Sequence, residues 1–264
     1  MTAHTFENIT LLVTHYNRSS SLERLLSAMK MHGLGFAGII VSDDGSSQEH
    51  FQKLTDLAAV YNFTLVGTEV NGGLGYNINK GQDAVKTPFT LYVQEDFIPS
   101  GRFATVLADS VALFNADQDL DLVRYFANFR FPYMKNFKKG FSKLLVPIFA
   151  LDYHKIYAYS DNPHLRRSTF FEKFGRYREG LTGDRTEYYM CISFIKNKGK
   201  AVLYNGFKTL FKHVNTPSER STMRRESWRS HDNPVLAFVR NAYRQVRYNY
   251  DILFKLTLIS ALYY

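Results

Sequence analysis

Short apolar runs alternate with helix-periodic segments through the first hundred residues. Four β-prone runs predict buried strands over 9–14, 38–42, 63–66 and 89–93. Between them, apolar residues recur at helical spacing and predict helices over 22–29, 51–58 and 76–85. Strands that are apolar throughout and joined by helices are typical of a parallel sheet covered on both faces. We therefore predict an α/β fold.

The rest of the chain follows a less regular pattern. It predicts helices over 106–114, 187–196 and 235–262, the last as one helix or a pair, and extended segments at 122–131 and 201–204. In the first half, Ser19, Ser20 and Ser21 are the candidates for the N-cap of the first helix.

Charge divides the chain unevenly. Residues 1–100 carry 6 Lys/Arg and 10 Asp/Glu, whereas residues 101–264 carry 27 and 14, within a formal net charge of +9. Much of the aromatic content, 16% of the chain, lies among those basic residues. Such a surface suits a phosphate-rich partner or an anionic lipid surface, although basic surfaces also serve solubility alone.

Cysteine usage and hydropathy indicate the compartment. The one cysteine, Cys191, excludes an intramolecular disulfide and a cysteine-based zinc site, which fits a reducing environment. The chain opens without a secretory signal, and no apolar stretch reaches the roughly 18 residues that a spanning helix needs. We expect a cytoplasmic protein, at the inner face of the membrane if it contacts lipid.

Polar clusters follow three of the four predicted strands, at 14–18, 43–44 and 95–96. Ligands of such sheets bind outside the carboxyl ends of the strands. The G-x-G-x-x-G fingerprint is absent after the first strand, which argues against a dinucleotide cofactor. Asp43 and Asp44 could accept hydrogen bonds from a ribose or a base, or could form only a turn.

The adjacent acids Glu95 and Asp96 follow a buried strand directly. Two neighbouring carboxylates there repel each other and are costly to desolvate. Mg²⁺ or Mn²⁺ would relieve that conflict, with substrate phosphates as further ligands. The alternative is a solvated loop in which one acid caps the next element.

Four segments in order resemble the successive motifs of family 2 glycosyltransferases, namely ITLLVTHYNR, IIVSDDGSS, NGGLGYNINKG and LYVQEDFIPSG. The resemblance implies the GT-A fold, a mostly parallel sheet with helices on both faces. It implies a nucleotide-sugar-binding half over 1–101, an acceptor-binding half over 102–230 and a basic aromatic helical segment over 231–264.

The same resemblance implies roles for particular residues. The nucleotide-binding candidates are Thr14, Tyr16, Asn17, Arg18, Asp43, Asp44, Asn71, Gly72, Gly75 and Asn77. Asp96 matches the second acid of the family's Asp-x-Asp motif, and Glu95 and His213 are the further candidates for binding Mn²⁺ or Mg²⁺. Gln94 replaces the first acid of that motif and cannot carry its charge.

The reaction implied by the resemblance is inverting transfer of a sugar from a nucleotide-diphosphate donor to an acceptor hydroxyl. The acceptor would be a saccharide or a lipid-linked molecule, in the synthesis of a cell-surface polysaccharide or glycolipid. A carboxylate would remove the proton of that hydroxyl. Glu187 is the first candidate for this base, and Asp184 and Glu179 are its rivals. Each of the three could instead be ordinary surface charge.

Two basic aromatic segments, 130–149 and 238–255, predict peripheral contact with a membrane, or else a core or an oligomer interface. A nucleotidyltransferase is an alternative function, but HYNRSS lacks the glycine-rich phosphate loop that it would need. A single-strand nucleic-acid-binding protein would share the basic aromatic composition. The acidic strand ends favour a metal–nucleotide pocket instead, so we expect no nucleic-acid partner. A non-catalytic sugar-binding relative is a third alternative.

Overall fold

The computed structural model describes residues 4–147, 150, 152–217, 219 and 234–254. Its first part has the predicted alternation: β1 (His4–His15), α1 (Ser19–Met31), β2 (Leu34–Asp43), α2 (Gln48–Tyr61), β3 (Thr64–Val66), α3 (Gly73–Asp83) and β4 (Phe89–Gln94). The predicted strands and helices of this part are thereby confirmed.

The second part has shorter elements. They are β5 (Phe97–Pro99), α4 (Phe103–Ala116), β6 (Leu122–Arg124), β7 (Met134–Asn136), β8 (Phe141–Leu144), η1 (Tyr153–Ala158), β9 (His164–Arg167), α5 (Phe170–Phe174), α6 (Gly183–Lys196), β10 (Ala201–Tyr204), β11 (Phe211–His213) and α7 (Pro234–Phe254). Of the extended segment predicted at 122–131, only the first three residues form a strand. The part of the predicted C-terminal segment at 231–233 and 255–264 lies outside the described residues.

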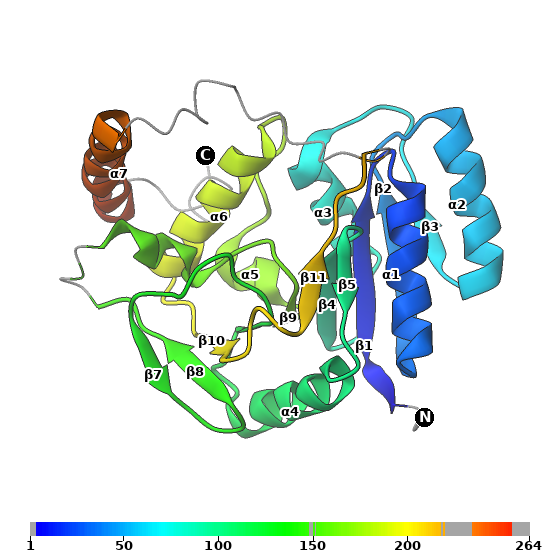
Figure 1. The fold of residues 1–264 in the computed structure, drawn as a ribbon, viewed down its shortest axis with the longest axis horizontal. Coiled ribbons are helices and arrows are strands. Elements are labelled where there is room, and N and C mark those ends of the chain that lie inside the picture. Colours follow the sequence, from blue (N-terminus) through cyan, green and yellow to red (C-terminus); the bar gives the residue numbers. More distant parts are fainter. Residues whose placement is uncertain (1–3, 148–149, 151, 218, 220–233, 255–264) are drawn as a thin grey trace.

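A nine-stranded sheet in the order β3-β2-β1-β4-β9-β6-β10-β8-β7 forms the centre of the molecule (Figure 1). The first four strands are mutually parallel. Strand β9 is antiparallel to both of its neighbours, β4 and β6, and so joins the two parts of the chain within one sheet. A separate pair, β5 and β11, lies beside it.

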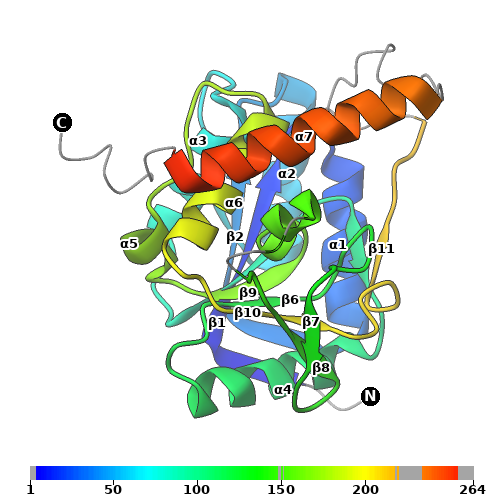
Figure 2. The same cartoon turned by 90° about the vertical axis from the view of Figure 1, so that its left-hand side faces the viewer.

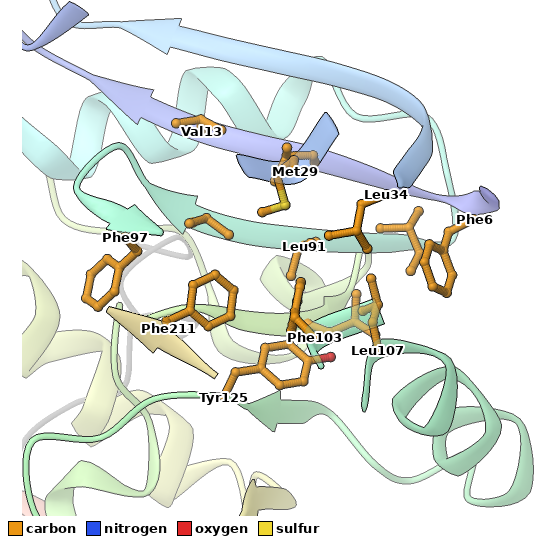
Figure 3. Packing of buried hydrophobic residues seen from close by; sticks show 14 of the residues in the cluster. Phe6, Val13, Met29, Leu34, Leu91, Phe97, Phe103, Leu107, Tyr125 and Phe211 are labelled. Carbon is orange, nitrogen blue, oxygen red and sulfur yellow. The ribbon is translucent and has the colours of Figure 1, made fainter. Parts of the chain in front are cut away.

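The central strands are apolar throughout because both faces of the sheet are covered. On β1, Leu11 and Val13 pack on one face and Leu12 packs on the other. Figure 3 shows the first of these faces, where α1, β1, β4, α4 and β11 contribute Met29, Val13, Leu91, Phe103 and Phe211. Continuous burial of this kind is what a parallel sheet with both faces covered requires.

The strand register brings three strand ends to one level. Thr14 of β1 lies opposite Ser42 of β2 and Gln94 of β4. Asp44 and Asp96 therefore each lie two residues beyond that level, on the same edge of the sheet. Because β1 lies between β2 and β4, these two chain positions are separated by two strand spacings, about 10 Å.

Candidate functional site

Asp44 ties the end of β2 to the glycine-containing loop before α3. Its Oδ1 accepts a hydrogen bond from the backbone N–H of Gly72, and its Oδ2 accepts one from Gly73, both at 2.9 Å. The residue is buried, and this burial raises the pKa of the Asp44 carboxyl against the effect of those hydrogen bonds. The Asp44 carboxylate therefore fixes the loop before α3 beside the carboxyl ends of the parallel strands.

Asp43 points into the protein instead. Its carboxylate accepts hydrogen bonds from His15 Nδ1 at 2.8 Å and from the hydroxyl and backbone N–H of Ser46. Burial lowers the pKa of His15, so its ring is neutral. With Nδ1 donating to Asp43, Nε2 accepts from the backbone N–H of Arg18 at 3.2 Å. Asp43 thus holds the turn after β1 through His15.

Arg18 joins that turn to the two acids after β4. Its guanidinium lies 2.7 Å from Asp96 Oδ2 and 3.2 Å from Glu95 Oε1, with only 4% of its side chain exposed. Burial and the neighbouring Asp96 raise the pKa of Glu95 to about 8. Hydrogen bonds from His213 and Arg18 hold the pKa of Asp96 below its ordinary value despite burial. The cluster carries a positive charge beside one ionised carboxylate.

The β11–β5 pair brings His213 to the same cluster from far along the chain. Its Nε2 lies 2.9 Å from Asp96 Oδ2, and the backbone N–H of Val214 donates to the Asp96 carbonyl at 2.8 Å. The other carboxylate oxygen, Asp96 Oδ1, is buried and has no hydrogen-bond partner among the described residues. An oxygen and an imidazole nitrogen are donors that suit Mn²⁺.

These two donors are too few to form a metal site on their own. Among the described residues, no group of three or more His, Cys, Asp or Glu side chains is arranged to hold a metal ion. Gln94 supplies no charge, and the Glu95 carboxyl already contacts Arg18. The residues therefore fit a divalent cation only if a ligand such as a diphosphate provides the remaining oxygens.

Several other predicted nucleotide-binding residues shape this edge. Asn17 has a φ of 52°, which few residues other than glycine adopt, and its side-chain oxygen accepts from the backbone N–H of Ser47 at 2.8 Å. Tyr16 is half-buried in the same turn. Thr14 lies at the strand end, and its hydroxyl bonds to that of Tyr92 at 3.0 Å.

Two candidates on α3 have bonding or packing partners within the protein. The side chain of Asn77 accepts from Ser42 Oγ at 2.7 Å and donates to the His15 carbonyl at 3.2 Å. A Cβ atom on Gly75 would lie 2.3 Å from the carbonyl oxygen of Arg178. Gly75 therefore permits α3 to approach the segment that precedes α6.

That approach creates a pocket shared by the two parts of the chain. Its volume is about 360 Å³, and its lining residues are Thr68, Val70, Asn71, Gly72, Tyr76, Glu179 and Gly180. Glu179 is exposed, and its Oε1 accepts from Asn79 of α3 at 2.8 Å. The structure thus brings Glu179 to the loop that Asp44 holds.

Glu187 is held by two hydrogen bonds to the segment before β9. It lies on α6, half-buried, and its Oε1 accepts hydrogen bonds from Ser160 Oγ at 2.8 Å and from the backbone N–H of Asp161 at 2.9 Å. Both bonds converge on one oxygen of the carboxylate. Asp184, in the first turn of the same helix, is exposed. The two hydrogen bonds therefore orient the Glu187 carboxylate and leave its second oxygen available.

Three residues at the site were missed by sequence reasoning. Lys80 Nζ donates to the Asp43 carbonyl at 2.5 Å, a position that the helix after the glycine loop could have indicated. The Glu219 carboxylate accepts from the backbone N–H groups of Ser20 and Ser21, each at 2.8 Å. The serine N-cap prediction for α1 is therefore wrong, because the cap position is Arg18 and no side chain of the turn provides a cap bond.

Asp161 is the third of these residues, and it lies just before β9. Its Oδ1 accepts from the hydroxyl groups of Tyr159 and Tyr177, at 2.7 and 3.0 Å. Burial and the nearby Glu187 raise the pKa of Asp161 to about 7. No sequence signal distinguishes this acid from a surface residue, because the strand that buries it is itself rich in charged residues.

A family model supports the arrangement. The one described as Glycosyl transferase family 2 matches residues 10–178. A search of curated proteins finds no match.

Solved structures with the same fold include the S. aureus protein TarS in complex with UDP-GlcNAc, at 15% identity and a TM-score of 0.57 over 82% of this chain and 62% of that chain. Another is the mannosyltransferase PcManGT from Pyrobaculum calidifontis in complex with GDP-Man and Mn²⁺, at 13% identity and a TM-score of 0.53 over 80% of this chain and 58% of that chain. The chain thus spans about three fifths of the length of these structures. The likeness establishes the GT-A fold.

Proposed function

Because the chain belongs to glycosyl transferase family 2, we propose that it transfers a sugar from a nucleotide-diphosphate donor to an acceptor hydroxyl with inversion at the anomeric carbon. The observation that carries this proposal is the common level of three strand ends. It puts the Asp44-bound glycine loop and the Arg18–Asp96 cluster on one edge of the sheet, at a separation that a nucleoside diphosphate can bridge. The similar solved structures bind UDP-GlcNAc or GDP-Man at a related fold, which supports the donor class.

In this proposal the nucleoside lies along the turn after β1 and the loop held by Asp44. The diphosphate lies near Arg18, whose fixed positive charge stabilises the charge that accumulates as the glycosidic bond breaks. Because Asp43 is bonded to His15 and Ser46, its role is to hold the turn, whereas Asp44 positions the loop.

Glu187 is the proposed base. Hydrogen bonds from Ser160 and the Asp161 backbone orient its carboxylate, which takes the proton of the acceptor hydroxyl as that oxygen attacks the anomeric carbon. The bond from the sugar to the nucleoside diphosphate breaks with its electrons going to the diphosphate. No covalent sugar–enzyme intermediate is needed, and the single displacement inverts the configuration.

A divalent cation, Mn²⁺ or Mg²⁺, would be held by Asp96 and His213. When bound, it supplies further positive charge beside the leaving diphosphate. Since the described residues provide so few ligands, we expect the cation to bind with the nucleotide rather than before it. Calorimetric titration of Mn²⁺ into the protein alone should give no binding, and saturating UDP or GDP should make binding measurable.

The test is a transfer assay with a panel of UDP-sugars and GDP-sugars and with saccharide and lipid-linked acceptors. The expected result is release of the nucleoside diphosphate, with a product of inverted anomeric configuration by NMR. A nucleotidyltransferase would instead release pyrophosphate from a nucleoside triphosphate and a sugar phosphate. Retained configuration, or pyrophosphate release alone, would overturn the proposal.

A further inference from the structure

Helix α7 has its polar side against the protein. Asn241, Gln245 and Asn249 recur every four residues and bond to Tyr153 and Lys155 of η1. The ring of Tyr248 packs on the same side of the helix. A surface helix of a globular protein normally turns its apolar stripe inward and its polar face to water. Hydrogen bonds therefore hold much of this helix in place, together with the packing of Tyr248 and Ile252 on the core, and the apolar residues on its other side are left for another partner.

Those apolar residues form one continuous stripe on the outward side. Its members are 57–73% exposed and recur at spacings of three and four residues, namely Val239, Tyr243, Val246, Tyr250 and Leu253. Phe238 and Phe254, at 73% and 68% exposed, border the stripe. Scattered exposed apolar residues need no explanation, but a contiguous stripe marks an interaction surface.

The stripe lies on a basic side of the molecule. Figure 1 shows α7 and the β7–β8 hairpin on the same side, and Figure 2, which looks onto that side, shows α7 lying across it. Around the hairpin, the exposed Lys135 and Lys138 stand among aromatic residues, and no Asp or Glu occurs between residues 122 and 151. On α7 itself, Arg247 is exposed beside Tyr243, while the one acid, Asp251, is buried.

We propose that this face docks on an anionic lipid bilayer, with α7 lying in the plane of the interface and its outward stripe among the acyl chains. An amphipathic helix with aromatic and basic residues binds such a surface through buried apolar area and attraction to anionic lipids. A second copy of the same face would bring like charges together, whereas an anionic surface neutralises them. No helix among the described residues is long and apolar enough to cross a bilayer.

The experiment is flotation of the full chain with two kinds of vesicle, phosphatidylcholine alone and phosphatidylcholine with about one third phosphatidylglycerol. The protein should float with the anionic vesicles, remain soluble with the neutral ones, and be released as salt is raised. The variant Val239→Ser/Val246→Ser/Leu253→Ser should bind at least about 30-fold more weakly, because three apolar side chains no longer enter the interface.

A matched control replaces exposed apolar residues elsewhere. Met31→Ser/Val60→Ser changes side chains on α1 and α2 that are 57% and 62% exposed, and it should float like the wild type. Circular dichroism melting of each variant checks that the fold is retained. Equal binding to both vesicles, no binding to either, or a dimer in light scattering that the triple variant dissociates would overturn the proposal. Flotation does not depend on catalysis, so its outcome is independent of the proposed transfer reaction.

Discussion

Two buried arginines show how differently the two parts of the chain use charge. Arg18 lies at the edge of the sheet, where its guanidinium contacts Glu95 and Asp96. Arg166, on β9, is fully buried and lies over the rings of Phe170 and Phe171. The first arginine gathers acids beside a surface that a ligand can reach. The second fills the interior, where aromatic faces and hydrogen bonds compensate for the lost water.

Burial alone does not identify a site. Both arginines are almost without exposed surface, yet only the Arg18 cluster lies at the carboxyl ends of parallel strands. Ligands of open α/β sheets bind at such ends. Substitutions in the first part should therefore change ligand binding, and substitutions around Arg166 should change stability.

The largest effect is expected at the proposed base. Glu187→Gln keeps the shape of the side chain but cannot take a proton, so kcat should fall about 10³-fold while nucleotide affinity is unchanged. Glu179→Gln and Asp184→Asn are the matched controls and should change kcat by less than about threefold. Steady-state kinetics with the preferred donor measures all three. A larger loss in either control would move the role of base to that residue.

Arg166→Met tests the prediction that substitutions around this buried arginine change stability rather than ligand binding. The change leaves Gln82 Oε1 without the donor that lies 2.8 Å away, and it removes the cation from the surrounding rings. The free energy of unfolding should fall by about 3 kcal/mol, with nucleotide affinity unchanged. Denaturant unfolding and calorimetry measure the two quantities. Arg185→Met, at an exposed position of α6, should change stability by less than about 0.5 kcal/mol.

The two neighbouring acids after β2 separate binding from stability within the first part. Asp44→Asn places an amide beside the N–H groups of Gly72 and Gly73, so the loop loses a charged acceptor and the Kd for the nucleotide should rise about 30-fold. Asp43→Asn should raise that Kd much less and mainly lower stability, because its partners are His15 and Ser46 inside the turn. The reverse pattern would contradict the assignment.

Per pH unit, Asp161 gives the smallest of these effects, as a dependence of stability on pH. Its pKa rises to about 7 in the folded protein, so between about pH 4 and pH 7 the folded state binds a proton that the unfolded chain has lost. This group therefore lowers stability as pH rises through that range, by about 1.4 kcal/mol per pH unit. Above pH 7 its effect is constant. Urea unfolding from pH 4 to 7 should show a decrease in stability in wild type, and Asp161→Asn should make that decrease shallower, leaving the part that Glu95 contributes through its own raised pKa.

Much of the first part could be predicted because its signals are local. The strands β1, β2 and β4 are apolar runs bounded by turns, and parallel strands meet at one edge whatever the rest of the chain does. From this, the meeting of Asp44 and Asp96 on one edge follows without coordinates. The bonding of Asp43 to His15 does not follow, because either acid could have faced inward.

The second part was less predictable because its structure depends on distant partners. Strand β9 has the sequence HLRR, which resembles a surface segment, yet it lies in the middle of the sheet and three of its residues are buried. Glu219 stabilises the start of α1 although 198 residues separate it from Ser21. The outward apolar stripe of α7 is visible as a pattern, but which side faces the protein depends on its bonds to η1.

If the carboxyl ends of β1, β2 and β4 form one nucleotide-diphosphate site, a bound nucleotide should protect all three together. Hydrogen-exchange mass spectrometry of the protein with and without saturating UDP or GDP measures this. Together, the segments 15–18, 43–46, 71–76 and 94–97 should become protected, while the hairpin of β7 and β8 should not change. Protection confined to that basic hairpin, or to only one of the strand ends, would contradict the claim.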